Sequence, residues 1–443
     1  MNFKLEEEKK LLGPYHLVLG LEIHMHVKTD RKMFCGCSTD GIYSVEPNTR
    51  TCPVCLGMPG ALPVPNRDAI EKTHRLGIAL NCRINEHSNF DRKHYFYPDL
   101  PKGYQISQYK NPLCSEGFLK LSSGTKIEIE RVHLEEDTAK SFHEGSETLI
   151  DFNKSGIALI ELVTKPTIYS VTDAVEFCRK VQEIVRYLGV SDANMEKGQL
   201  RIEPNISLRT QEMFEEGKLP EYKVEVKNIN SFKFMEKAVI SEIKRQRKIL
   251  EKGEALRQEN RGYNEKTGKT VLQRSKEEAE DYRYFPEPDI PPMVFDKDYL
   301  AKLGSSKVRL PEEVKKGLRD KYDLSDQEVS VLFSKNLVGL LEEAVGLGGD
   351  VKRLVNLLVN DVSIRDASAQ ELIRLIRERS VKIDNVPKLE EIVIGVMNDN
   401  HAVVKQIRDG KKSAIEFLVG QVMRMIQGKA DPNLIRELIN KSI

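Results

Sequence analysis

Apolar and polar residues alternate along the first two-thirds of the chain, and the pattern then becomes helical. Residues 15–295 mix strand-like alternation with helix-like spacing and are rich in Pro, Gly and Tyr. Beyond Pro292 the apolar spacing is almost entirely helical, and Val386-Pro387 interrupts it. We therefore predict an α+β domain over residues 1–295, an all-helical domain over 296–385 and a small helical tail domain over 386–443.

Three helices are predicted from apolar spacing and capping residues. From Thr172 to Leu188, apolar residues recur at helical spacing, and a glycine follows as a typical C-terminal signal. A second apolar stripe covers residues 415–426. Asp431-Pro432 then has the form of an N-cap followed by proline at the first helical position, which predicts a short final helix.

The strand predicted for residues 20–27 carries chemically useful side chains on its polar face. Its apolar residues point one way, toward a core, while Glu22, His24 and His26 point the other way. This face thus presents a carboxylate and two imidazoles in a row. The alternative is a polar strand edge that faces solvent.

Two later segments carry similar residues. Residues 129–137 place His133 and Glu135 on one face of a predicted strand. Residues 157–163 are a continuous apolar run with Glu161 in the middle, which is typical of a buried strand. Because an ionised carboxylate is costly to bury alone, Glu161 needs a cation or a proton. A structural salt bridge to Lys or Arg is the alternative.

Together these segments predict one metal centre. Its candidate ligands are three carboxylates and an imidazole, from Glu22, His24, Glu135 and Glu161. Oxygen-rich ligand sets favour Mg²⁺ or Mn²⁺ over Zn²⁺, and Mg²⁺ in such sites usually serves a nucleotide phosphate. The prediction requires three separated strands to be neighbours, which the sequence alone does not establish.

Four of the seven cysteines form a pattern of their own. Cys35 and Cys37 are followed, in a Gly- and Pro-rich setting, by Cys52 and Cys55. The C-x-C and C-x-x-C pairs predict a structural Zn²⁺ site, because four thiolates leave no open coordination position. A disulfide and a set of buried thiols are the alternatives.

The total charge says little about partners, but the tail is locally basic. The 443 residues carry a net charge of +1, which implies no nucleic-acid partner by itself. Residues 402–443 hold eight Lys or Arg against four acids, an excess that suits contact with RNA phosphates or a solvated helix face. Without a bilayer-length apolar run or a secretory signal, the chain is predicted to be cytoplasmic, with no membrane partner.

Familiar nucleotide and amidase motifs are absent from the sequence. Gly262 to Thr270 approaches a phosphate-binding loop but has five residues between its glycines, and it is more typical of a hairpin turn. No Rossmann glycine pattern and no serine-glycine motif for an amidase nucleophile occur. The chain thus offers metal-site chemistry without a recognisable hydrolytic nucleophile.

Long and unusual motifs are spread over nearly the whole chain. They are residues 20–24 (GLEIH), 59–63 (PGALP), 90–99 (FDRKHYFYPD), 104–108 (YQISQ), 133–137 (HLEED), 227–231 (KNINS), 281–289 (DYRYFPEPD) and 417–421 (FLVGQ). In these motifs and in their order, the chain resembles the GatB/GatE family of tRNA-dependent amidotransferase subunits.

The resemblance implies a fold and a reaction. The fold is a cradle-like catalytic domain, distantly similar to glutamine synthetase, followed by the helical domains. The reaction is that of a carbon–nitrogen ligase, in which ATP phosphorylates the carboxylate of Glu-tRNA(Gln) or Asp-tRNA(Asn) and ammonia displaces the phosphate. An amidase-type A subunit would supply ammonia through a channel, and a small C subunit would complete the heterotrimer.

The resemblance also implies roles for individual residues. The family's metal ligands match the residues that the strand patterns select, namely Glu22, His24, Glu135 and Glu161. Lys102 and Glu136 match residues of the ammonia path, where Glu136 would accept a proton. In the family pattern, aspartate often stands where this chain has Glu203.

Basic and aromatic residues accompany these motifs. Arg92 is predicted to bind the nucleotide cofactor, and Lys93 to act on the reacting phosphate together with Lys102. They lie near the aromatic residues 95–97, which would meet the tRNA end or simply pack as a loop.

Two other functions fit the sequence. The first is a non-catalytic, zinc-stabilised tRNA-binding scaffold subunit, in which Glu22 and Glu161 could become glutamine without loss of activity. The second is a metal-dependent ligase acting on a free small acid, whose ATP consumption would not depend on mischarged tRNA.

Overall fold

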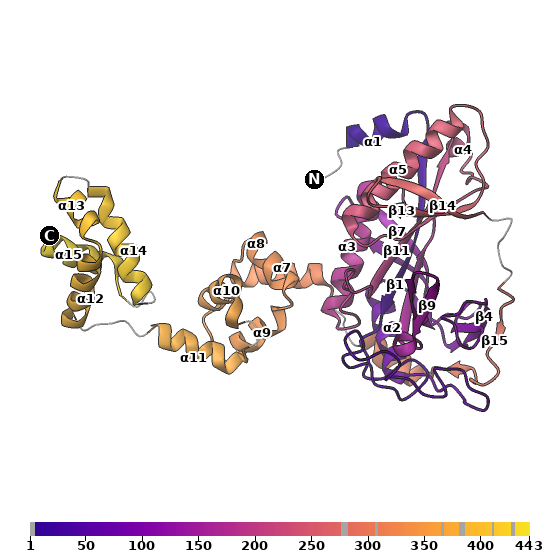
Figure 1. Ribbon diagram of the computed structural model, residues 1–443, viewed down its shortest axis with the longest axis horizontal. Helices are drawn as coiled ribbons and strands as arrows, with labels where there is room; N and C mark the ends of the chain where they lie inside the picture. The colour runs from indigo at the N-terminus through magenta and orange to yellow at the C-terminus, as the bar shows by residue number, and fades with distance from the viewer. Residues whose placement is uncertain are drawn as a thin grey trace. The chain divides into compact units, whose positions relative to one another are not determined.

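The computed structural model describes residues 5–275, 282–305, 309–364, 367–380, 386–409, 412–426 and 430–443. The chain divides into two compact units, Met1–Val314 and Lys315–Ile443 (Figure 1). The described part of the first unit combines sheets with helices, whereas that of the second unit is helical. This distribution confirms the predicted α+β class followed by helical structure.

A mixed sheet forms the centre of the first unit. Its described strands number nine, in the order β14-β13-β12-β11-β1-β10-β7-β6-β2. They are β1 (His16–His26), β2 (Arg83–Ile84), β6 (Cys114–Lys120), β7 (Lys126–Glu136), β10 (Ala158–Thr164), β11 (Leu200–Arg209), β12 (Val224–Lys227), β13 (Glu259–Asn264) and β14 (Lys269–Ser275). Neighbouring strands are antiparallel, apart from β12 and β13, which are parallel.

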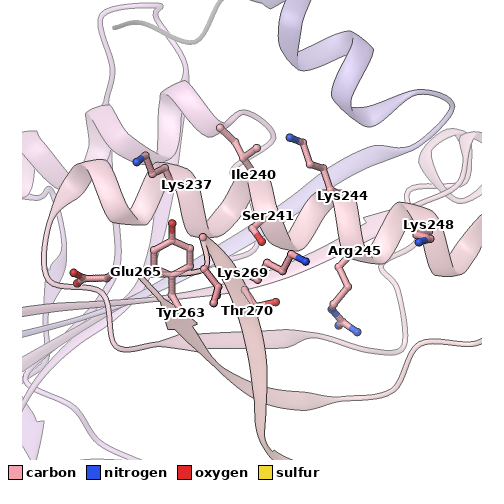
Figure 2. A pocket seen from close by; sticks show the side chains of 12 residues that line it. Lys237, Ile240, Ser241, Lys244, Arg245, Lys248, Tyr263, Glu265, Lys269 and Thr270 are labelled. Atoms are coloured by element: carbon pink, nitrogen blue, oxygen red, sulfur yellow. The ribbon is translucent and has the colours of Figure 1, made fainter.

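One end of the sheet is the hairpin β13–β14, beside helix α5 (Phe232–Leu250; Figure 2). In its turn, Asn264 Oδ1 accepts hydrogen bonds from the backbone N–H groups of Lys266 and Thr267 at 3.0 and 3.1 Å. Gly268 has a φ of 66°, a backbone conformation that glycine adopts without strain. These features confirm the hairpin turn predicted for this segment.

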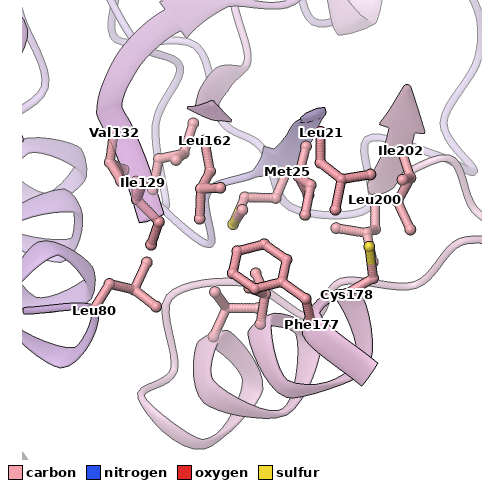
Figure 3. Close-up of a cluster of buried hydrophobic side chains, with 14 of the residues drawn as sticks. Leu21, Met25, Leu80, Ile129, Val132, Leu162, Phe177, Cys178, Leu200 and Ile202 are labelled. Atoms are coloured by element: carbon pink, nitrogen blue, oxygen red, sulfur yellow. The ribbon is translucent and has the colours of Figure 1, made fainter. Parts of the chain in front are cut away.

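Helices α2 (Arg67–Ala79), α3 (Val171–Tyr187) and α5 pack on the apolar side of the sheet. Leu21 and Met25 of β1 lie against Phe177 and Cys178 of α3, together with Leu162 of β10 (Figure 3). Because successive side chains of a strand point to opposite faces, the polar residues of β1 point away from this core. The core therefore determines which face of the sheet carries the candidate ligands.

Local sequence sets the ends of α3. Ser170 caps the N-terminus by accepting a hydrogen bond from the Asp173 N–H at 3.3 Å. Gly189 follows the C-cap residue with a φ of 65°. The helix predicted from the apolar spacing is confirmed to within one residue at each end.

Smaller sheets and short helices surround the central sheet. Their described elements are β3 (His87–Ser88) with β16 (Met293–Val294), β8 (Lys140–Glu144) with β9 (Glu147–Asp151), the sheet β15-β4-β5 (Phe285–Pro286, Asp91–His94, Tyr104–Ser107), α1 (Leu5–Leu12), α4 (Gln211–Glu215) and a 3₁₀ turn (Phe152–Lys154). Through β15, residues far along the chain return to lie beside β4.

The first unit continues past the predicted boundary at residue 295 and ends at Val314. The next helix, α6 (Lys297–Ser305), packs on α2, and the Tyr299 hydroxyl lies 2.9 Å from Nδ1 of buried His74. Phe295 contacts the same imidazole ring edge to face. These aromatic contacts explain why the compact unit extends beyond residue 295.

The second unit consists of short helices in its described parts. They are α7 (Pro311–Tyr322, which begins in the first unit), α8 (Asp326–Ser334), α9 (Val338–Gly346), α10 (Val351–Asn360), α11 (Ala369–Ser380), α12 (Val386–Asp399), α13 (His401–Arg408), α14 (Ile415–Met425) and α15 (Pro432–Ser442), with 3₁₀ turns at Val362–Ile364 and Lys412–Ala414. Asp431 caps α15 as predicted, accepting from the Asn433 N–H. Helices α12 to α15 share one apolar core, which includes Leu389 and Leu418. In the part of the chain that the structure describes, no helix has the length and apolar character needed to cross a membrane.

Candidate metal centre

Three adjacent strands bring three of the four predicted ligands together. Strand β10 lies between β1 and β7, and all three run antiparallel to their neighbours. His24 of β1 is directly opposite Glu161 of β10, and Glu161 is opposite His133 of β7. Glu135 lies two residues further along β7, so its side chain shares this face of the sheet. The separate strand predictions therefore meet in one place.

The ligand atoms of this cluster lie within the reach of a single ion. His24 Nε2 is 3.6 Å from both Glu135 Oε1 and Glu161 Oε2, and the three ligand atoms lie within 4.8 Å of one another. His133 Nε2 lies 3.2 Å from Glu161 Oε2, and Ser107 Oγ donates to Glu135 Oε2 at 3.3 Å. Among the described residues, the ion-pair partners of Glu161 are histidines rather than Lys or Arg.

Burial and mutual proximity strongly perturb these groups. Burial and the neighbouring Glu161 raise the pKa of Glu135. The pKa of Glu161 is held well below its usual value because His133 and His24 outweigh the opposing effect of burial. Burial acts to lower the pKa of His24, but the carboxylates of Glu161 and Glu135 raise it to about 10. The cluster thus attracts positive charge, as a divalent-cation centre must.

Glu22 lies in a second acidic cluster, with Glu203 and Glu225. Glu22 and Glu203 are opposite each other on β1 and β11, and Asn205 Nδ2 donates to Glu22 Oε1 at 3.0 Å. Lys227 Nζ lies 3.0 Å from Glu203 and 2.9 Å from Glu225. The assignment of Glu22 to the same ion as His24 stays a prediction.

The acids of the second cluster differ in their affinity for a proton. His24 and Lys227 lower the pKa of Glu203 to about 2 against the effect of burial. Burial and the nearby Glu203 raise the pKa of Glu225 to about 7. Glu225 and Lys227 were not predicted as site residues, although the alternation of Val224 to Lys227 places both on one strand face.

Strand β4 places Lys93 beside the metal cluster and Arg92 in a separate ion-pair network. Burial acts to lower the pKa of Lys93, but Tyr284, Glu135 and Glu161 raise it. Arg92 instead donates to both oxygens of Glu287 at 2.8 and 2.9 Å and to Asp289 at 3.2 Å. Lys93 is thus near the candidate ligands, whereas much of the donor capacity of Arg92 is already used.

Lys102 and Glu136 form a buried ion pair. Lys102 Nζ lies 2.6 Å from Glu136 Oε1, which also accepts from the Ile106 N–H at 3.0 Å. Glu136 is 2% exposed, so it is not a surface acid. The pair faces a cavity of about 220 Å³, which Cys35 and Cys55 also line.

The four predicted zinc ligands are close together. The Sγ atoms of Cys35, Cys37, Cys52 and Cys55 lie within 4.8 Å of one another, and none of these cysteines is in a disulfide. Lys32, which is fully buried, directs its ammonium at Cys55 Sγ (3.5 Å) and at the Arg50 carbonyl (2.7 Å). Convergent thiols with a neighbouring cation suit a metal held by several thiolates.

Asp137 is a buried charge whose partners the sequence did not reveal. It accepts from His26 Nε2 at 2.7 Å, from Arg201 at 2.9 Å and from Lys154 at 3.0 Å. Burial acts to raise its pKa, but Arg201 and Lys154 hold it well below the usual value. His26, which lies on the polar face of β1 next to the candidate ligand His24, is thus part of a structural network next to the metal cluster.

By fold and site, this is an α+β protein with a candidate divalent-cation centre on the open face of its sheet. The sequence matches the GatB/GatE catalytic domain over residues 17–301 and the GatB domain over residues 366–443. It is 42% identical to the B subunit of the aspartyl/glutamyl-tRNA(Asn/Gln) amidotransferase of Thermodesulfovibrio yellowstonii, over 96% of this chain and 99% of that protein. The proteins of the same name from Thermotoga petrophila and Persephonella marina are 41% and 39% identical, each over 96% of this chain and 98% of theirs. The chain belongs to the GatB/GatE family.

Replacing Asp137 with asparagine will destabilise the first unit. The change leaves the side chains of Arg201, Lys154 and His26 without their carboxylate, so we expect the free energy of unfolding to fall by about 3 kcal/mol. Since the folded state lowers the pKa of Asp137, this contribution is present above about pH 4 and is lost as the pH falls further.

Chemical denaturation of the whole chain measures this effect. Asp192→Asn is the matched control, because Asp192 pairs with Lys28 on the surface, where such a pair contributes about 1 kcal/mol or less. Equal losses in the two variants would contradict the role assigned to the Asp137 network.

Proposed function

We propose that the chain is the B subunit of a tRNA-dependent amidotransferase, an ATP-dependent carbon–nitrogen ligase that converts Glu-tRNA(Gln) or Asp-tRNA(Asn) to the amide. Family membership supports the class of enzyme. The observation that carries the proposal to a mechanism is the convergence of His24, Glu135 and Glu161 on one face of the sheet. We also propose that the fold of the catalytic domain is distantly similar to that of glutamine synthetase.

Activation of the carboxylate is the step that this face would serve. A carboxylate oxygen is a poor leaving group, and phosphorylation converts it into a good one. Phosphoryl transfer depends mainly on positioning and on neutralising negative charge. Mg²⁺, when bound, would supply that neutralising charge. His24, Glu135 and Glu161 would hold the ion, with Glu22 reaching it from the adjacent acidic cluster.

Lys93 would complete the charge balance around the transferring phosphoryl group. Lys93 is partly buried, and its ammonium lies 4.9 Å from the centre of the Tyr282 ring. Arg92 would contact the nucleotide only through N–H groups that Glu287 and Asp289 leave free. The two neighbours on β4 would therefore act differently, Lys93 on the reacting group and Arg92 at the margin of the site.

Exposed aromatic rings near Lys93 would meet the end of the tRNA. Phe96 is 81% exposed and Tyr97 is 52% exposed, so these two residues do not pack as a buried loop. Tyr109 and Tyr284 stack at 4.4 Å, with Tyr109 half exposed. Exposed rings of this kind can stack on unpaired bases, which are present at the tRNA 3′ end.

The buried pair of Lys102 and Glu136 would receive ammonia. Glu136 would take a proton from ammonium or from the tetrahedral adduct, and Lys102 would hold the carboxylate in place. An amidase-type A subunit would release the ammonia and a small C subunit would join the pair. This division of labour fits the absence of an amidase nucleophile motif from this sequence.

Zinc and the tail would serve structure and tRNA binding. The four clustered thiols would hold Zn²⁺ as a closed structural site. In the tail, Lys405, Arg408 and Arg424 are basic residues of described helices, while Lys411 and Lys429 lie outside the described residues. Of the other functions that fit the sequence, the scaffold predicts no need for the metal ligands, and the small-acid ligase predicts no need for mischarged tRNA.

Glu161→Gln is expected to abolish amide formation while leaving glutamine hydrolysis by the assembled complex largely intact. The change removes the charge that pairs with His24 and His133. In the wild-type complex, phosphate release from ATP should depend on mischarged tRNA, and the variant should lose it. Both rates are measured on the same purified heterotrimer.

Glu128→Gln is the control for this experiment, because Glu128 lies on β7 and pairs with Lys165 at the surface. Normal transamidation by the Glu161 variant would refute the metal assignment. Phosphate release without mischarged tRNA would favour the small-acid ligase.

Replacing Cys52 and Cys55 with serine together is expected to abolish zinc binding and lower the melting temperature. The purified wild-type chain should hold about one zinc ion, as measured by atomic emission. Cys82→Ser is the control, since Cys82 lies outside the cluster. Unchanged zinc content in the double variant would show that these cysteines hold no zinc.

Deleting residues 386–443 is expected to weaken tRNA binding about tenfold while changing single-turnover chemistry at saturating tRNA much less. A cut after Gly410 is a poorer variant, because α12 and α14 share one apolar core and would be separated. Filter binding and gel filtration of the complex measure affinity and assembly. An unchanged tRNA affinity would exclude the tail from binding.

A further inference from the structure

A basic groove lies at the β14 end of the central sheet. It has a volume of about 730 Å³ and runs between α5 and the hairpin β13–β14 (Figure 2). The lysines that line it are Lys237, Lys244, Lys248 and Lys269. All four are exposed, and none forms an ion pair with another described residue. This unpaired positive charge plays no part in the chemistry assigned to the opposite face of the sheet.

The three helical lysines are arranged in a row. They are separated by seven and four residues, which places them on one face of α5 at 3.6 residues per turn. At 1.5 Å per residue, the row from Lys237 to Lys248 is about 16 Å long. Lys269 extends from β14 on the other side of the groove (Figure 2). The row is long enough to meet several groups of an extended anion.

The floor of the groove is held firmly by a buried carboxylate. Glu242 is fully buried and accepts from Arg245 at 2.7 Å, from Gln246 at 3.0 Å and from Thr270 Oγ1 at 2.7 Å. These bonds tie α5 to β14 beneath the lysines. They also neutralise Arg245, which pairs with Glu259 as well. Free charge in the groove therefore comes from the lysines, and Glu265 is the one acid among the described lining residues.

We propose that this groove binds the phosphodiester backbone of the tRNA substrate, an inference that rests on the proposed function. Lysines on a flexible stem contact phosphates without reading bases, as a protein that accepts a folded RNA by shape requires. The tail charge is in part neutralised, since Arg436 pairs with Glu416 and Lys441 lies 3.5 Å from Glu390. The groove lysines, in contrast, form no ion pair with another described residue.

An acidic protein partner fits the groove less well. Lysine is depleted at protein–protein interfaces because its strongly hydrated ammonium is costly to desolvate. A protein partner would favour exposed apolar side chains. On β14 these are the half-exposed Val271 and Leu272, which do not line the groove. RNA is therefore the occupant that the charge arrangement favours.

The test compares two double variants of the assembled heterotrimer. The groove variant combines Lys244→Gln and Lys248→Gln, and the control variant combines Lys218→Gln and Lys252→Gln. Both remove two positive charges from the first unit, but Lys218 and Lys252 pair with Glu216 and Glu254 outside the groove. Binding of an unmodified tRNA(Gln) transcript is measured over a range of salt concentrations. The groove variant should bind about tenfold more weakly at low salt, and the slope of log Kd against log salt should fall by about one for each lost phosphate contact. The control should retain the wild-type slope.

The outcomes separate this proposal from the proposed function. If the wild-type complex does not bind the tRNA, the proposed function fails. If the wild-type complex binds it and both double variants keep the wild-type slope, only the groove proposal is overturned. Loss of subunit assembly in the groove variant, with assembly retained by the control, would assign the groove to a protein partner and also overturn it. Lys269→Gln, on a surface hairpin, provides a second variant if the double variant is poorly folded, and it should lower the slope by about one.

Discussion

Carboxylates held out of water need positive charge beside them, and this requirement organises the polar face of the central sheet. An isolated buried ion costs several kcal/mol even after the protein relaxes around it. The sheet places acids from five neighbouring strands, and from the segment that follows one of them, on or near one face. Each group of acids has its own cationic or imidazole partners. These are His24, His133 and Lys93 for Glu135 and Glu161; Arg201, Lys154 and His26 for Asp137; and Lys227 for Glu203 and Glu225. The opposite face of the sheet is apolar and packs against the helices, so the core supplies no charged partners for these acids.

The balance of charge differs among the buried acids on this face of the sheet. Asp137 has three cationic or imidazole partners within 3.0 Å, and its pKa is well below the usual value. Glu135 has a raised pKa because burial and Glu161 outweigh its histidine and lysine neighbours. A fully compensated carboxylate gains little from a metal ion, whereas an under-compensated one gains much. Within the candidate metal centre, Glu135 is therefore the acid that a cation would stabilise most, whereas the lowered pKa of Glu161 comes from its imidazole partners His133 and His24.

Short-range patterns allowed the strands, the ends of α3 and the β13–β14 hairpin to be predicted, because each depends on periodicity or on a capping residue. The same patterns selected His24, Glu135 and Glu161 as candidate metal ligands, because charged or polar side chains on strands that pack in a core require a partner. Short-range patterns could not predict the order of strands in the sheet. No local signal indicates that β12 lies beside β11, which brings Glu225 close to Glu203. The pairing of Arg92 with Glu287 was missed for the same reason, as the partners are 195 residues apart in sequence. The exposure of Phe96 likewise depends on which distant segments cover the loop.

The net charge of +1 conceals a segregation of charge that bears on how a polyanion would meet this chain. In the first unit, acids gather on the polar face of the sheet, while lysines that form no ion pair with another described residue lie along α5 and β14 at its edge. The acidic face repels phosphates unless a divalent cation is present, whereas the lysine row attracts them directly. Under the proposed function, such a field would hold the body of a tRNA by its backbone. Only the end that carries the amino acid would reach the acidic face, where a bound divalent cation would offset the negative charge. The separation of binding charge from catalytic charge would thus orient the substrate before any specific contact forms.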